Sequence, residues 1–181
     1  MALCESINKS RNVHCNTGFS GVQAVGFLPK INGGLTLTAG DVFEGTGMTG
    51  SVYKFFLKND ANTYSEEIAA DENTGTVVYN GTLTLTLPVL DRETRDQVKL
   101  LAMGQSHVFI EMYDGKKLLM GAEFGASLTG GTIATGGART DMSGYTLTLT
   151  SKERRPIVFV GATGSTIYNS AINLTGMITP Q

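Results

Sequence analysis

The clearest feature of the chain is a strict alternation of leucine and threonine in three runs. These runs are Leu35–Thr38, Thr82–Leu87 and Thr146–Thr150. Because side chains alternate between the two faces of a β-strand, each run predicts leucines on one face and hydroxyls on the other. The expected strands are half-buried, with a wet, uncharged face. The runs contain no acid, base or thiol, so they favour a structural scaffold over an enzyme.

Further alternation predicts strands at Gly21–Leu28, at Ser51–Lys58 and around Tyr64–Ala69. The dipeptide Asn80–Gly81 lies between two such runs and predicts a tight type I′ hairpin turn. A single long strand with a bulge at Gly81 is the alternative.

One helix interrupts the strands, and we expect it over Asp91–Met103. Asp91 is a good N-cap, and Glu93 in the first turn suits the positive end of the helix dipole. Val98 and Leu101 form the apolar stripe, and Gly104 ends the helix.

A second hairpin follows the helix, with strands at Ser106–Tyr113 and Lys116–Phe124. The glycine-rich segment Thr129–Gly144 then predicts a mobile loop, and Tyr145–Thr150 and Pro156–Val160 predict the closing strands. The expected hairpin tip consists of Tyr113, Asp114, Gly115 and Lys116. The candidate assembly loop contains Thr129, Gly130, Gly131, Gly136, Gly137, Arg139 and Gly144.

Composition supports a single β-rich domain. The chain has 181 residues, of which 41% are hydrophobic and 17% charged, and its 23 glycines exceed the usual share. We therefore expect a mainly β fold, an antiparallel β-sandwich or half-barrel with one flanking α-helix, over residues 21–160. Residues 1–20 and 161–181 are expected to be N-terminal and C-terminal arms.

Charge argues against a nucleic-acid-binding protein, because the net charge is −2. The segment Asn59–Asn73 contains no Lys or Arg and predicts an acidic surface made of Asp60, Glu66, Glu67, Asp71 and Glu72. No apolar stretch has the length of a membrane span, and no signal peptide is recognisable, so we expect synthesis in the cytoplasm. Cys4 and Cys15 are then expected to be thiols.

Several motifs have catalytic counterparts but lack their context. Gly45–Gly50 matches G-x-G-x-x-G but precedes a β run rather than a helix, so we interpret it as a loop. Cys15 could form a nucleophile–base pair only with His107, which lies far away in the sequence. We interpret Lys152–Arg155 as a charged turn. We expect no catalytic residue, no metal site and no cofactor.

The order of elements resembles the tail-tube family of tailed bacteriophages. The resemblance spans about Gly21–Val160 and rests on Thr82–Leu90 running into Asp91–Gly104, and on Tyr145–Val160. It implies subunits that join edge to edge into rings around a β-lined channel. Within this group the chain looks like a ring or tube protein of the kind found in short-tailed crAss-like gut phages.

The resemblance implies a structural virion protein in the tail, made in the host cytoplasm. Its partners would be further copies of itself and other tail or portal-proximal proteins, with DNA only in transit and no membrane. A surface of threonines and acids would let a polyanion pass without holding it. The alternatives are a head-to-tail connector or capsid-decorating protein, and a carbohydrate-binding β-sandwich of the adhesin kind.

Overall fold

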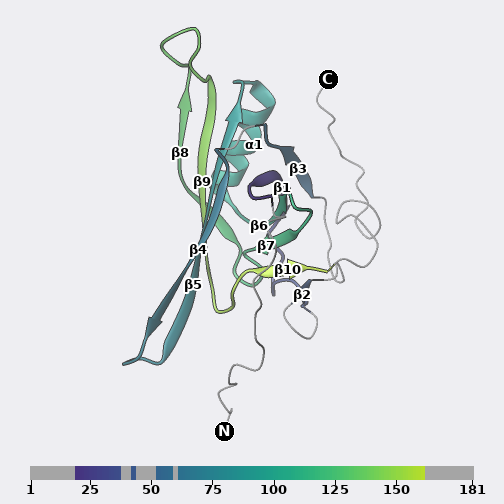
Figure 1. The fold of residues 1–181 in the computed structure, drawn as a ribbon, viewed down its shortest axis with the longest axis vertical. Helices are drawn as coiled ribbons and strands as arrows, with labels where there is room; N and C mark the ends of the chain where they lie inside the picture. Colours follow the sequence, from purple (N-terminus) through teal and green to yellow (C-terminus); the bar gives the residue numbers. More distant parts are fainter. Residues whose placement is uncertain (1–18, 38–41, 44–51, 59–60, 162–181) are drawn as a thin grey trace.

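The computed structural model describes residues 19–37, 42–43, 52–58 and 61–161, and the fold is mainly β with one flanking helix (Figure 1). The elements are, in chain order, β1 (Val22–Pro29), β2 (Val42–Phe43), β3 (Tyr53–Phe56), β4 (Thr63–Asp71), β5 (Thr76–Pro88), α1 (Arg92–Met103), β6 (Gln105–Met112), β7 (Lys117–Met120), β8 (Ala126–Ala134), β9 (Gly144–Glu153) and β10 (Val158–Val160).

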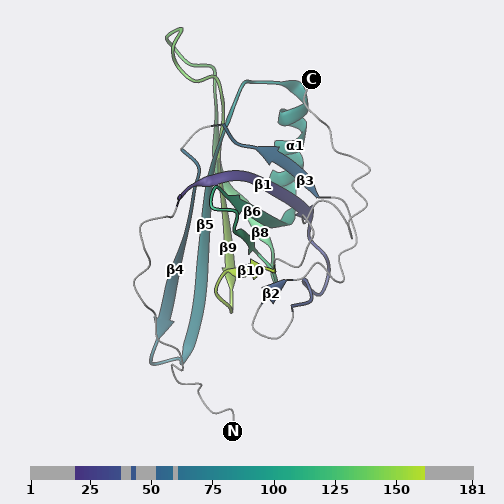
Figure 2. The same ribbon diagram turned by 45° about the vertical axis from the view of Figure 1, so that its right-hand side comes forward.

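The strands form one strongly bent sheet with two parts. The first part has the order β8-β9-β5-β4 and is extended by two long hairpins that point in opposite directions (Figure 1). The second part contains β3, β1, β6, β7, β10 and β2, and it joins the first where β6 pairs briefly with β8 at Gln105–Ser127 and Ser106–Ala126. Figure 2 shows β1 crossing the first part at a steep angle. The expected all-antiparallel sheet is wrong in one place, because β2 and β10 are parallel.

The main core lies between the two parts of the sheet. Leu83, Leu85, Leu147 and Leu149 from β5 and β9 pack there against β1 and β6, and α1 covers one end through Val98 and Leu101. A second cluster lies on the other side of β6 and contains Leu28, Phe43, Phe109, Leu119 and Val158. The alternation in Thr82–Leu87 and Thr146–Thr150 therefore gives one buried face, as predicted.

The helix forms as its sequence predicts. The Asp91 side chain accepts a hydrogen bond from the Thr94 backbone N–H at 2.8 Å, which satisfies one of the open donors of the first turn. The helix ends at Gly104, whose N–H bonds to the Leu100 carbonyl. Gly104 itself is extended and not left-handed.

The predicted hairpin at Asn80–Gly81 is wrong, whereas the alternative of a single long strand is confirmed, without the bulge expected at Gly81. β5 runs unbroken through both residues, and its pairing with Lys152 and Ser151 of β9 keeps a regular register. A type I′ turn needs positive φ at both central residues, and neither residue has it. The hairpin turn lies instead between β4 and β5, at Glu72–Gly75.

Two other expectations need correction. Leu35–Leu37 is not a strand, because Gly33 and Gly34 form a turn at positive φ and the Leu35 N–H then bonds to the carbonyl of Ala122; Thr38 lies outside the described residues. The predicted loop Thr129–Gly144 is shorter than expected. Its first part belongs to β8 and pairs with β9, which leaves a loop at residues 135–143.

Candidate assembly site

The outward face of the β8-β9-β5-β4 sheet is lined by hydroxyl groups, and we call it the hydroxyl face. Three threonine pairs from β5 and β9 lie opposite one another along its centre. The register adds further hydroxyls from the flanking strands β4 and β8. Its hydroxyl-bearing residues are Thr63, Ser65, Thr76, Thr82, Thr84, Thr86, Ser127, Thr132, Thr146, Thr148 and Thr150, of which Thr86 is buried.

Few charges share the hydroxyl face. The register places Glu67 and Asp71 of β4 on it, together with Lys152 of β9. All three lie towards the β4–β5 turn, so the threonine pairs form an uncharged band. The face is thus uncharged along its centre and slightly acidic near one end.

Both outer edges of this sheet are open. β4 pairs only with β5 among the strands described, and from Leu128 onward β8 pairs only with β9. Exposed edges are available for pairing with another chain. Each strand is antiparallel to its neighbour, so the β4 edge of one copy and the β8 edge of another have the polarity for antiparallel pairing.

The loop at residues 135–143, here called the tip loop, has a defined conformation. One carboxylate oxygen of Asp141 accepts hydrogen bonds from the N–H groups of Gly137 (2.9 Å) and Ala138 (2.7 Å), and the Asp141 N–H donates to the Ala138 carbonyl. These bonds hold the pKa of Asp141 below its usual value. The tip loop is therefore a turn closed by the Asp141 side chain, and its mobility stays a prediction. Arg139 lies exposed within it.

Gly130 and Gly131 lie in β8, and Gly144 begins β9. Gly144 has a packing role, because a Cβ there would overlap the carbonyl oxygen of Leu87.

The hairpin tip Tyr113–Lys116 forms as predicted between β6 and β7. Lys116 makes an ion pair with Asp114 at 2.6 Å, and its N–H bonds to the other Asp114 oxygen at 3.0 Å. Gly115 has a φ of 83°, in the left-handed region that glycine adopts without a steric penalty. The polar groups of this tip largely satisfy one another.

The predicted acidic surface does not form one patch. Glu66 and Glu67 point to opposite faces of β4, and Asp71 and Glu72 lie at the β4–β5 turn. Asp60 lies outside the described residues.

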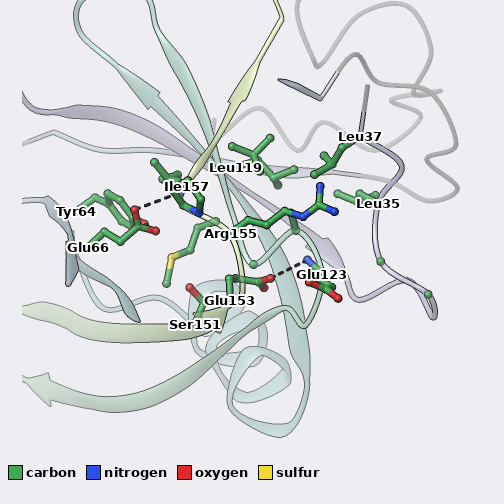
Figure 3. A pocket seen from close by; sticks show the side chains of 17 residues that line it. Leu35, Leu37, Tyr64, Glu66, Leu119, Glu123, Ser151, Glu153, Arg155 and Ile157 are labelled. Carbon is green, nitrogen blue, oxygen red and sulfur yellow. Dashed lines mark hydrogen bonds between the residues drawn. The ribbon is translucent and has the colours of Figure 1, made fainter. Parts of the chain in front are cut away.

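Glu66 takes part in a cavity of about 260 Å³, here called the acidic cavity (Figure 3). Its polar wall combines side chains from β4 and β9 with the segments that follow β7 and β9. Leu119, Ile157 and Val158 form much of its apolar wall. The polar side chains are Tyr64, Glu66, Glu123, Ser151, Glu153 and Arg155.

Backbone donors hold two of the carboxylates in place. Glu153 accepts from the N–H groups of Glu123 (3.2 Å) and Phe124 (2.9 Å), and Glu66 accepts from the N–H of Ile157 (3.2 Å), as Figure 3 shows in part. The two carboxylates are therefore fixed on different walls of the cavity.

Burial dominates the electrostatics of the cavity. It raises the pKa of Glu153 above its usual value, and the negative charge of Glu123 adds to the effect, although the backbone donors oppose it. Burial also raises the pKa of the Tyr64 hydroxyl, with a further contribution from Glu66. Ser151 is 5% exposed, and its hydroxyl makes no hydrogen bond with any described side chain. The cavity thus presents acceptors that a cation would satisfy.

His107 lies in β6 and is fully buried. Its Nε2 accepts from the Ile31 N–H at 3.1 Å, and Nδ1 bonds to the Gly121 carbonyl, so Nδ1 carries the proton. Burial lowers its pKa. With both ring nitrogens engaged, His107 is a structural residue and not a base for a thiol.

Several predicted features lie outside the part of the chain that the structure describes. These are Gly45–Gly50, Cys4, His14, Cys15, most of the expected N-terminal arm and nearly all of the C-terminal arm. Within residues 19–37, 42–43, 52–58 and 61–161, no three His, Cys, Asp or Glu side chains are grouped to hold a metal ion. In the same part of the chain, no helix combines the length and apolarity that crossing a membrane requires.

Comparison of the chain with protein-family models, with curated proteins and with solved structures finds no match.

The sequence did not indicate the acidic cavity. Its carboxylates come from Glu66, Glu123 and Glu153, which are far apart in the chain. The available signal was the position of Glu66 between Tyr64 and Ile68 on one side of β4, where a charge is unexpected.

Proposed function

We propose that the chain is a structural subunit that assembles edge to edge into a ring or tube, with the hydroxyl face lining the channel, as in a phage tail. The observation that carries the proposal is a four-stranded sheet with a hydroxyl face and two open edges of opposite polarity. A contact between two different edges is head-to-tail, and such contacts close into rings when the rotation allows it.

The offset of the two edges supports a closed assembly. The end of β4 at Thr63 lies level with Thr84 of β5, whereas the end of β8 at Ala134 lies level with Pro88. The two edges are therefore displaced along the strands. A closed barrel needs such a stagger, since its strands tilt relative to the barrel axis.

The lining would suit DNA that passes and does not bind. Lys and Arg hold DNA through phosphate contacts, and the threonine band contains none. In this proposal the protein belongs to the virion tail, contacts other tail or portal-proximal proteins, and performs no catalysis.

The test exploits two adjacent alanines on the β4 edge, Ala69 and Ala70. In an antiparallel pair, neighbouring residues point their N–H groups alternately towards the partner strand and away from it. Ala69→Pro and Ala70→Pro therefore form a matched pair of variants. One removes an N–H that bonds to β5, and the other removes an N–H that points away from β5 to the open edge.

Negative-stain microscopy and light scattering should show rings of the wild-type protein. The proline variant that keeps the wild-type circular dichroism and melting curve should remain a 19.2 kDa monomer. Rings of wild-type abundance from that variant would refute edge-to-edge assembly through β4.

A carbohydrate-binding sandwich is the second candidate, because one groove has aromatic walls. This groove of about 280 Å³ lies between α1 and the strands β1 and β3, and Phe27, Tyr53, Phe55, Leu100 and Leu101 line it. Glycan-array binding that Tyr53→Ala abolishes, from a protein that stays monomeric, would favour this candidate over the ring.

A further inference from the structure

The acidic cavity has an excess of negative charge. Three carboxylates line it, and the guanidinium of Arg155 is the one cationic group among the lining residues. The Arg154 guanidinium lies 3.9 Å from the carboxylate of Glu123, at the rim of the cavity. Glu66 and Glu153 are both fixed by backbone donors, and neither makes a salt bridge with a described cation.

The buried Ser151 hydroxyl, which has no partner among the described residues, independently points to a ligand site. Buried hydroxyl groups in folded proteins nearly always have a hydrogen-bond partner. Ser151 projects from the same face of the sheet as the neighbouring Glu153, and both side chains line the cavity (Figure 3). A ligand with several N–H donors would satisfy the hydroxyl and the carboxylates together, and a guanidinium has five.

The tip loop supplies such a group at the far end of the molecule. Arg139 is exposed, and it makes no ion pair with any residue the structure describes. The hydrogen bonds of Asp141 hold the loop in a turn, which would limit the conformational entropy lost on binding. Figure 1 shows this loop at the end of the long axis, beyond α1, whereas the cavity lies beside β7 and β10. One copy cannot fill its own cavity with its own Arg139.

We propose that the tip loop of one copy docks into the acidic cavity of another copy, with the Arg139 guanidinium bound by Glu66 and Glu153. The inference rests on the proposed function, because it supplies the contact between successive rings. It joins two different surfaces, so it can repeat from ring to ring.

Disulfide cross-linking tests the contact directly. In a background with Cys4→Ser and Cys15→Ser, one tagged variant carries Ala138→Cys beside Arg139, and a second carries Glu123→Cys at the rim of the cavity. Mild oxidation of the mixture should link the two tagged chains. Adding Arg139→Ala to the first variant should lower the yield about tenfold, and Arg139→Lys should lower it less.

The matched control places the cysteine on the other hairpin, as Asn73→Cys, and should give only background linking. A yield that does not depend on Arg139, or that equals this control, overturns the docking proposal. Rings without Arg139-dependent linking would leave the proposed function standing and refute only the docking. Arg139-dependent linking without rings would support the docking and count against the ring.

Discussion

At the scale of single residues, His107 links the buried face of β6 to two backbone segments. The Ile31 N–H donates to one ring nitrogen, and the other donates to the Gly121 carbonyl. This arrangement requires a neutral ring, which agrees with the lowered pKa. The positive charge of Lys30 disfavours protonation further.

We expect acid to destabilise the protein through His107. Its folded-state pKa lies below the usual 6.5, so below pH 6.5 the unfolded chain binds a proton that the folded chain does not, and the free energy of unfolding falls. His107→Gln should cost about 1–3 kcal/mol at neutral pH by leaving a buried partner unsatisfied. Denaturant titrations should show the two stability curves converging as pH falls below 6.5. Glu153 titrates in both proteins, so its opposite effect on the free energy of unfolding cancels when the two curves are subtracted. Curves that stay parallel below pH 6.5 would contradict the role given to His107.

Gly81 is needed for close packing and not for a turn. A Cβ on it would lie 2.8 Å from the Ser151 hydroxyl oxygen and 2.9 Å from the Tyr64 hydroxyl oxygen. Gly81→Ala should therefore destabilise the fold by about 1–3 kcal/mol, measured by urea unfolding. Gly130→Ala is the matched control, because the nearest atom to its added Cβ is 4.0 Å away, and its effect should stay within about 0.5 kcal/mol. Equal losses would show that the contacts at Gly81 relax freely.

These two residues also show where sequence reasoning fails. Asn80–Gly81 carries the strongest short-range hairpin signal, yet long-range pairing of β5 with β9 overrides it. The role of His107 was equally hard to predict from the sequence. Its two backbone partners, at Ile31 and Gly121, lie in other segments of the chain that the sequence does not place beside it.

At the scale of elements, the periodic segments were predictable. The alternation of leucine and threonine gave β5, β9 and their buried faces, and the capping residue gave the start of α1. The short run at Leu35 was not a strand, because a neighbouring glycine turn and the contact with Ala122 determine its path. The glycine-rich segment Thr129–Gly144 was only partly a loop, since its first part belongs to β8 and pairs with β9.

We expect Asp141 to determine the order of the tip loop. Asp141→Ala removes two hydrogen bonds to backbone N–H groups, so cleavage by trypsin after Arg139 should become several-fold faster while the melting temperature stays unchanged. Asp114→Ala is the control, because it loosens the other tip and should leave cleavage at Arg139 at the wild-type rate. A large fall in the melting temperature would mean that Asp141 supports the core and not only the loop.

At the scale of the whole molecule, the order of strands and the acidic cavity could not have been predicted. Several neighbouring strands come from distant parts of the chain, among them β1 with β6, β5 with β9 and β2 with β10. Among the described strands, β6 pairs with three others. The cavity exists only because the bend of the sheet brings Glu66 and Glu153 near the segment after β7. Such a site depends on packing geometry, for which no local pattern gives a signal.

A lysine on the hydroxyl face should convert a passive channel into one that retains DNA. Thr84→Lys adds one positive charge per subunit at the centre of the face, whereas Thr36→Lys adds the same charge on an exposed loop. Assembled Thr84→Lys protein should retain DNA on filters at low salt and release it as salt rises. Wild-type and Thr36→Lys assemblies should retain far less. Equal retention by the two lysine variants would mean that Thr84 does not face the DNA path.

The strict period of two in β5 and β9 also constrains how this gene can change in length. A single inserted residue in either strand would move every following leucine to the wet face and every threonine into the core. Insertions at Glu72–Gly75 or in the tip loop shift no such register. Relatives of the chain should therefore differ in length at the two hairpin ends, whereas β5 and β9 should tolerate substitution but neither insertion nor deletion.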